Sequence, residues 1–217
     1  MLHQEPAGPT EYSSKTIELD KSQRLRVTLR MGAGDLRVTD SSQNLLRGDF
    51  EYNVAEWKPE VQYKSEGETG ILNIQQPGHT HNYVGSTRYR WDLQLTNKVP
   101  MDLTVHFGAG QARMDLGSMM LRSVEINMGV GQLDMDLRGA VKHSYNVTIH
   151  GGVGQATVRL PATAAIYAEA HGGIGAVNVT GLHNRGGHWE SDAWAGAQNR
   201  INVEVHGGIG EIRLIAD

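Results

Sequence analysis

The chain contains no cysteine, which excludes disulfide bonds, thiolate nucleophiles and cysteine-based metal sites. Aromatic residues are also scarce, at 6%, with 2 Phe against 27 Gly. The interior must therefore be built from Val, Ile, Leu, Met and Ala, which favours thin, regularly stacked layers over one bulky core. No apolar run reaches the roughly 18 to 20 residues that a membrane-spanning helix needs.

An excess of charge of one sign is missing as well. The formal net charge is −4, which provides no basic surface for nucleic acid or for an anionic membrane. Residues 1–15 are polar and contain proline, so we expect a flexible linker of the kind that follows a removed signal peptide or lipid anchor. This favours an extracytoplasmic location, secreted, periplasmic or on the cell surface, although the absence of cysteine fits a cytosolic protein equally well.

What the chain does have is an internal repeat. A Gly-x-Gly tripeptide recurs with start-to-start gaps of 76, 21, 23, 21 and 35 residues. Three of the gaps nearly agree, and the two larger ones indicate the same unit carrying insertions. The six copies are Gly32-Ala33-Gly34, Gly108-Ala109-Gly110, Gly129-Val130-Gly131, Gly152-Val153-Gly154, Gly173-Ile174-Gly175 and Gly208-Ile209-Gly210.

Each tripeptide lies between two stretches in which apolar and polar residues alternate, which is typical of strands with one buried face. Ile126, Met128 and Val130 share one parity, and the parity shifts by one residue before Leu133 and Met135. Such a shift at a glycine pair indicates a sharp corner between two strands. We therefore expect the central residue of each tripeptide to point inward. We also expect four residues to stack inside successive coils: Val105, Met128, Ile149 and Val205.

The pattern predicts an all-β, single-domain β-solenoid (β-helix) with coils of about 21 residues, each made of a strand, a Gly-x-Gly corner and a second strand. The solenoid is expected over residues 16–217. Its first part, 16–96, is irregular and has an exposed loop at 76–90. Its second part, 97–217, consists of regular coils with an insertion at 181–199 that is expected to cap the last coil.

Aligning the repeats places one histidine-rich column two residues before the first glycine, with its side chains facing outward. If the coils stack in chain order, His150, His171 and His206 form a contiguous imidazole column. Neutral imidazoles can bind Zn²⁺ or Cu²⁺, but a flat column suits tetrahedral ligation poorly, so a solvated polar ladder is the favoured interpretation. His79 and His81 form a second, weaker metal-ligand pair in the 76–90 loop. No metal and no cofactor are predicted.

Two further outward columns follow the corner. The first should form a glutamine ladder from coil to coil, and it consists of Asp35, Gln111, Gln132, Gln155, Ala176 and Glu211. The second mixes charges of both signs, and it consists of Arg37, Arg113, Asp134, Thr157, Asn178 and Arg213. Neither column matches a paired-carboxylate catalytic site or a calcium site. A nucleotide-binding interpretation of the glycines also fails, because a strand follows each second glycine where a helix is required.

Three stretches resemble the bacterial toast-rack domains of the LiaF-like, adhesin-like group of cell-envelope proteins. They are the run from Asn97 to Leu116, the later Gly-Val-Gly and Gly-Ile-Gly units, and the segment from Phe50 to Tyr63. The resemblance extends from about residue 16 to the end of the chain. It implies a β-solenoid outside the cytoplasm, belonging to a domain family of unknown function with no established catalytic residues.

The sequence therefore predicts a non-catalytic interaction or structural module of the bacterial cell envelope, adhesin-like or associated with envelope stress, whose partner is an unidentified protein or envelope component. Two alternatives remain open. One is a parallel β-helix enzyme acting on polysaccharide, which would need a groove with two or more carboxylates within about 10 Å of each other. The other is weak metal binding by the histidine column.

Overall fold

The computed structural model describes residues 4–41, 43–78, 82–84 and 86–217. Its regular secondary structure is strand, apart from one 3-10 turn, η1 (Ala55–Trp57). In these residues, no helix has the length and apolar character needed to cross a membrane. The strands are β1 (Gln4–Pro6), β2 (Glu11–Glu18), β3 (Arg24–Ser41), β4 (Asn44–Tyr52), β5 (Glu60–Glu66), β6 (Thr69–Gln75), β7 (Asn82–Val84), β8 (Tyr89–Thr96), β9 (Met101–Asp115), β10 (Leu121–Asp136), β11 (Tyr145–Leu160), β12 (Ala165–Thr180), β13 (His183–Asn184), β14 (Trp189–Glu190) and β15 (Arg200–Ala216).

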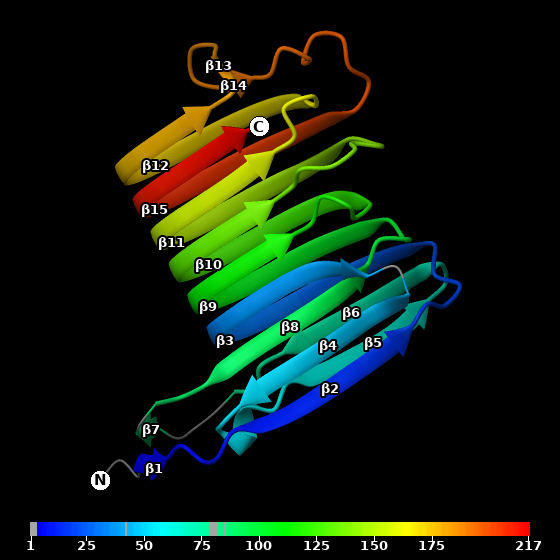
Figure 1. The fold of residues 1–217 in the computed structure, drawn as a ribbon, viewed down its shortest axis with the longest axis vertical. Coiled ribbons are helices and arrows are strands. Elements are labelled where there is room, and N and C mark those ends of the chain that lie inside the picture. The colour runs from blue at the N-terminus through cyan, green and yellow to red at the C-terminus, as the bar shows by residue number, and fades with distance from the viewer. Residues whose placement is uncertain (1–3, 42, 79–81, 85) are drawn as a thin grey trace.

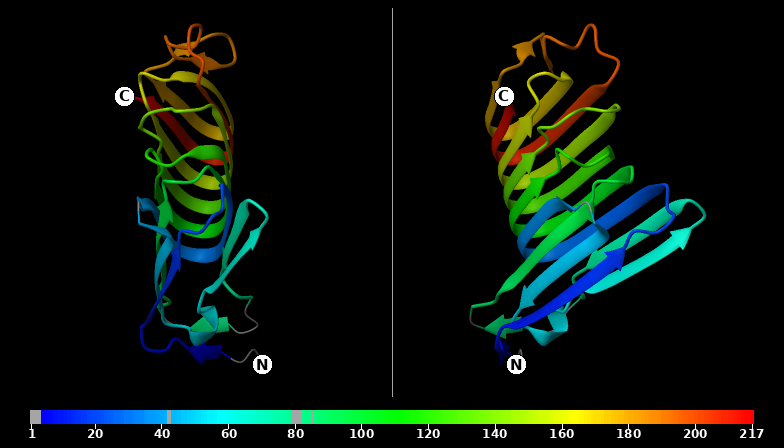
Figure 2. Two further views of the ribbon diagram at one scale, coloured as in Figure 1. Left: turned by 90° about the vertical axis from the view of Figure 1, so that its right-hand side faces the viewer. Right: turned by 45° about the vertical axis from the view of Figure 1, so that its right-hand side comes forward.

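Six long strands carry the Gly-x-Gly units, and each bends at its tripeptide into a U with two arms (Figure 2). The strands run parallel, and their bends lie in register from one strand to the next. The U-shaped strands stack along one axis (Figure 1), and the core fills the space between the arms. The predicted β-solenoid is confirmed, with each coil formed by one bent strand and a loop across the open side.

The glycines at the bend are required by the close approach of neighbouring strands. At Gly154 the backbone has a φ of +140°, a region that residues with a side chain rarely adopt. A Cβ atom placed there would lie 1.8 Å from the carbonyl oxygen of Gly131 on the adjacent strand. Every rung therefore needs glycine at this point, because any side chain would push the stacked backbones apart.

The central residue of each tripeptide points outward, so the predicted inward orientation was wrong. Val130 is 55% exposed, whereas Met128 and Leu133 on either side of the bend are buried. On the outside of a tight bend the four residues between two inward positions all face solvent, and a simple shift in parity does not capture this. The four large exposed residues form what we call the bend ridge, which consists of Val130, Val153, Ile209 and Ile174 in spatial order.

The interior columns follow the register closely. Val105, Ile126, Ile149 and Val205 occupy one level and are all buried. Met128, predicted at this level, is also buried but lies two residues further along, opposite Phe107. Ile126, three residues before the first glycine of its tripeptide, is the residue of β10 that matches Val105 and Ile149.

The strand order departs from chain order at the C-terminus. The sheet runs β12, β15, β11, β10, β9, β3, so the last strand of the chain lies between β11 and β12 (Figure 1). It pairs in parallel with β11 over Tyr145–Leu160 and with β12 over Ala165–Thr180. The assumption that coils stack in chain order is therefore wrong for the final strand.

The predicted insertion at 181–199 covers the end of the stack. Within it, β14 pairs with the first arm of β12, and the buried Ser191 hydroxyl donates to the carbonyl of Ala164 at 2.7 Å. The same hydroxyl accepts a hydrogen bond from the Ile166 amide at 2.9 Å. The second arm of β12 receives no such cover, and Ile174 at its start is 72% exposed.

At the other end the two arms of β3 continue into separate layers. The first arm pairs with β6, which pairs with β5, while the second arm pairs with β8, followed by β4 and β2 (Figure 2). Part of the chain's small aromatic content lies here, where Trp91 packs edge-on against Phe50 and Tyr89 at centroid distances of 5.9 and 5.8 Å. Large rings fill the wider space that the diverging layers leave.

The irregular part contains more strand than expected. Residues 1–15, predicted as a linker, contain β1 and the first part of β2, and the predicted loop at 76–90 contains β7 and the start of β8. β1 pairs in parallel with β7. Both segments lack apolar alternation, so their strands form through pairing with each other or with β4 and β3, which local sequence does not reveal.

Candidate functional site

The predicted histidine column exists, with its members in a different order. The register places Arg30, His106, Asn127, His150, His206 and His171 at one level on successive strands. His206 is the middle member because β15 lies between β11 and β12. Its ring stacks on His150 at a centroid distance of 5.1 Å and on His171 at 5.2 Å, with interplanar angles of 12° and 19°.

The ring stacking argues against a shared metal ion. The lone pairs of an imidazole lie in the ring plane, so three nearly parallel rings direct their nitrogens along parallel lines that do not converge. Two of the rings are instead paired with carboxylates on their own strands, His206 with Glu204 at 2.6 Å and His171 with Glu169 at 3.5 Å. Over the described ranges, no group of three or more histidine, aspartate or glutamate residues is arranged to hold a metal. His79 and His81 lie outside the described residues.

The glutamine column is also in register, but its ladder is only partly formed. Gln155 donates to Glu211 on the next strand at 3.4 Å, while Gln132 donates to Asp134 on its own strand at 3.0 Å. Glu211 also accepts from Arg213 and Asn178, and the Arg213 guanidinium lowers the pKa of this carboxyl. The predicted chain of glutamine-to-glutamine bonds is replaced by bonds to carboxylates, which are stronger acceptors.

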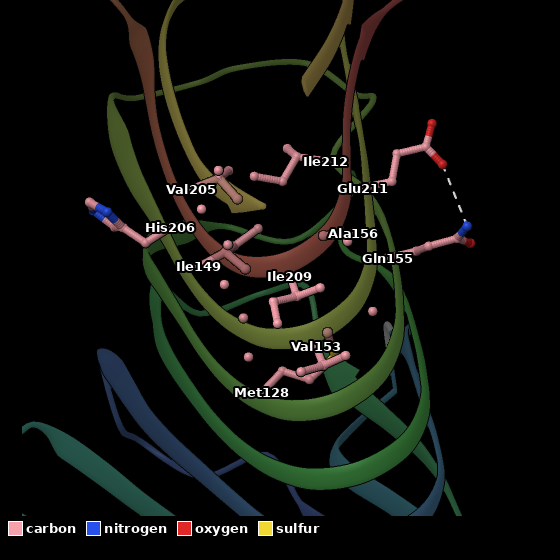
Figure 3. Close-up of a pocket in the computed structure, with 18 of the residues that line it drawn as sticks. Met128, Ile149, Val153, Gln155, Ala156, Val205, His206, Ile209, Glu211 and Ile212 are labelled. Atoms are coloured by element: carbon pink, nitrogen blue, oxygen red, sulfur yellow. Dashed lines mark hydrogen bonds between the residues drawn. The ribbon is translucent and has the colours of Figure 1, made fainter. Parts of the chain in front are cut away.

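The bend ridge and the interior behind it offer no ligand cavity. Figure 3 shows Val153 and Ile209 at the bend and Ile149, Val205 and Ile212 between the arms. Behind the bend lies a cavity of about 30 Å³, which is room for one or two water molecules. It exists because Gly151, Gly207 and Gly172 occupy the interior level that Met31, Phe107 and Met128 fill on earlier strands.

The mixed-charge column forms one side of a groove of about 550 Å³ on the outer face of the second arms of β3, β9, β10 and β11. The column was predicted from the sequence, whereas the next outward column, two residues further along each strand, was missed. This second column could have been predicted from the alternation of inward and outward residues along each strand. We call this feature the arm groove, and its polar lining consists of Arg37, Arg113, Asp134, Thr157, Thr39, Asp115, Asp136 and Arg159.

The arm groove contains the carboxylate arrangement on which the enzyme alternative depends. Asp115 and Asp136 are register partners on adjacent strands, so their backbones are about 4.8 Å apart. The Arg138 guanidinium donates to Asp136 at 2.6 Å and lowers the pKa of that carboxyl. A glycosidase acid needs a pKa shifted in the opposite direction, so Asp136 is held in the ionised form and is unsuited to donate a proton.

The fold and these surfaces together define a class of protein, a rack of parallel U-shaped strands that presents continuous polar columns on both outer faces. The family model for the N-terminal domain of toast-rack proteins, a domain of unknown function, matches residues 6–159. The chain therefore belongs to the toast-rack family, as the resemblance implied.

One solved structure agrees with this assignment. A candidate cell adhesion protein from Clostridium sporogenes is 31% identical and superposes with a TM-score of 0.93, over 96% of this chain and 100% of that chain. A candidate adhesin from Bacteroides fragilis is 12% identical, with a TM-score of 0.39 over 98% of this chain and 100% of that chain. No curated protein matches the sequence.

Proposed function

We propose that the chain is a non-catalytic interaction module of the bacterial cell envelope, located outside the cytoplasm. The observation that carries the proposal is the register of the six bent strands, which holds outward side chains in straight columns on both faces of the rack. Such an array is rigid and repetitive, which suits recognition of an extended partner more than the chemistry of one reacting bond. The 31% identical candidate adhesion protein has the same fold over its whole length.

The enzyme alternative has less support in the site. Its paired carboxylates are present in the arm groove, but Asp136 is bound to Arg138 and its pKa is lowered. The groove also lies open on a sheet face, where water competes with every polar contact. Catalysis by general acids depends on a carboxyl kept protonated by a water-poor environment, and the surroundings of Asp136 do the reverse.

Co-sedimentation of the purified chain with washed, detergent-extracted bacterial cell walls tests the proposal. We expect saturable retention on the walls, and none on vesicles of neutral phospholipid. Absence of retention on the walls would overturn the proposal. A release of reducing sugar from the walls that continues with time and is lost in Asp136→Asn would also overturn it, in favour of the enzyme.

A further inference from the structure

The arm groove contains two arginines side by side. Arg37 on β3 and Arg113 on β9 are register partners, and both are exposed. Like charges directly opposite each other destabilise a sheet. In the described part of the chain neither forms an ion pair, whereas Arg213 in the same column is bound to Glu211 at 2.8 Å. The register partner of Arg37 on its other side is Asp92 on β8, and in the described structure the two side chains form no ion pair.

Carboxylates lie on both sides of the pair, Asp92 beside Arg37 and Asp134 beside Arg113, and neither is bound to an arginine of the pair in the described structure. Asp134 follows Arg113 in the same column on β10, and its carboxylate accepts from Gln132 at 3.0 Å. Asp136 is bound to Arg138. Two adjacent guanidinium groups present N–H donors that match a carboxylate or a phosphate, so the pair suits an anion from another molecule.

The rest of the groove restricts what that anion can belong to. Asp134 is the register partner of Arg113 on the next strand, and Asp115 lies two residues after Arg113 on the same strand. Both carboxylates would repel a second anionic group of the ligand. Ionised carboxylates are acceptors only, so they suit a ligand that offers hydroxyl donors beside its charge. A groove of about 550 Å³ falls within the size range of small-molecule sites.

We propose that the arm groove binds an acidic saccharide, with its carboxylate or phosphate on Arg37 and Arg113 and its hydroxyls donating to Asp134 and Asp115. This rests on the proposed function and deepens it, because it names the class of envelope ligand that the module recognises. The groove is open, so we expect affinities of about 1 mM for a single sugar, with recognition of a polymer strengthened by several weak contacts.

Titrations followed by NMR of the ¹⁵N-labelled chain test the proposal with four probes: glucuronate, glucose 6-phosphate, glucose and inorganic phosphate. We expect saturable shifts in β3, β9 and β10 with the two acidic sugars, and at least tenfold weaker binding of glucose and of phosphate. If glucose binds as tightly as glucuronate, the arginine pair is not the site. If phosphate binds as tightly as glucose 6-phosphate, the groove binds only simple anions and the saccharide is excluded.

A double variant, Arg37→Gln with Arg113→Gln, should bind the acidic sugars at least tenfold more weakly. The matched control is Arg26→Gln with Arg30→Gln, which removes the same charge from the other arm of β3, where both residues are exposed. Equal losses in the two variants would show a general charge effect and overturn the proposal. Retention on cell walls without binding of any probe would overturn this inference alone, whereas probe binding without wall retention would overturn the proposed function alone.

Discussion

At the bend, the space available for a single Cβ atom determines which glycines the stacked strands require. At Gly152 a Cβ would lie 2.3 Å from the carbonyl oxygen of Gly129, whereas at the neighbouring Gly151 the nearest atom would be 3.9 Å away. The two positions are adjacent on one strand, and they differ in whether the Cβ would point at the next backbone or into the small cavity behind the bend. Steric access, and not glycine content as such, therefore determines which glycines are irreplaceable.

We predict that Gly152→Ala lowers the free energy of unfolding by about 1 to 3 kcal/mol, because the stacked backbones must move apart to accept the methyl group. Gly151→Ala is the control. It should be neutral or stabilise by up to about 1 kcal/mol, since it restricts the unfolded chain and meets no clash. Urea denaturation measures both values. Equal effects of the two substitutions would contradict the role assigned to backbone contact at the bend.

At the scale of the element, strand β10 is linked to the end of the chain through Arg138. This guanidinium donates to Asp136 at 2.6 Å and contacts Asp217 at 3.3 Å, which joins the end of β10 to the residue that follows β15. All three side chains are partly exposed, so the contribution of the pair to stability is modest. Its pH dependence is nevertheless defined by the lowered pKa of Asp136.

We predict that Arg138→Gln slightly destabilises the protein at pH 7. The pKa of Asp136 is lower in the folded protein than its ordinary value of 3.8. The stabilisation is therefore complete above that value and is lost as the pH falls through the folded pKa. Unfolding by urea at several pH values should show the two proteins converging below about pH 3.8. Arg122→Gln, on the other arm of β10, is the control and should show no such convergence.

At the scale of the whole molecule, the most consequential feature is the position of the last strand. β15 pairs with a full-length strand on each side, whereas β12, which precedes it in the chain, is the end of the stack. β15 is therefore enclosed between two long strands, an arrangement from which we expect strong protection against local opening.

Amide hydrogen exchange tests this arrangement directly. We expect the amides of β15 to exchange as slowly as those of β11, and the second arm of β12, residues 175–180, to exchange much faster. Its outer edge has no strand partner among the described residues, so local opening requires little loss of contact. Fast exchange throughout β15 with slow exchange in the second arm of β12 would instead indicate stacking in chain order.

Alternation in the sequence predicts the all-β class, the repeat, and the levels of three outward columns, including the one that contains His150, His171 and His206. These follow from alternation along an extended backbone, a covalent property that holds for each strand alone. It failed at the bend, because the positive φ of the second glycine and the tight curvature turn Val130 and its equivalents outward.

Only the tertiary structure decided the order of the strands. The six bent strands carry the same pattern, so any two of them could pair, and nothing local distinguishes β11 beside β12 from β11 beside β15. The order depends on how much apolar surface the strand at the end of the stack leaves exposed. The second arm of β12 has only Val177 and Val179 packed against the core, both half-buried, whereas β15 supplies the buried Ile212 and Leu214 at the same levels. The strand with more apolar area is enclosed on both sides because burial of that area stabilises the fold most.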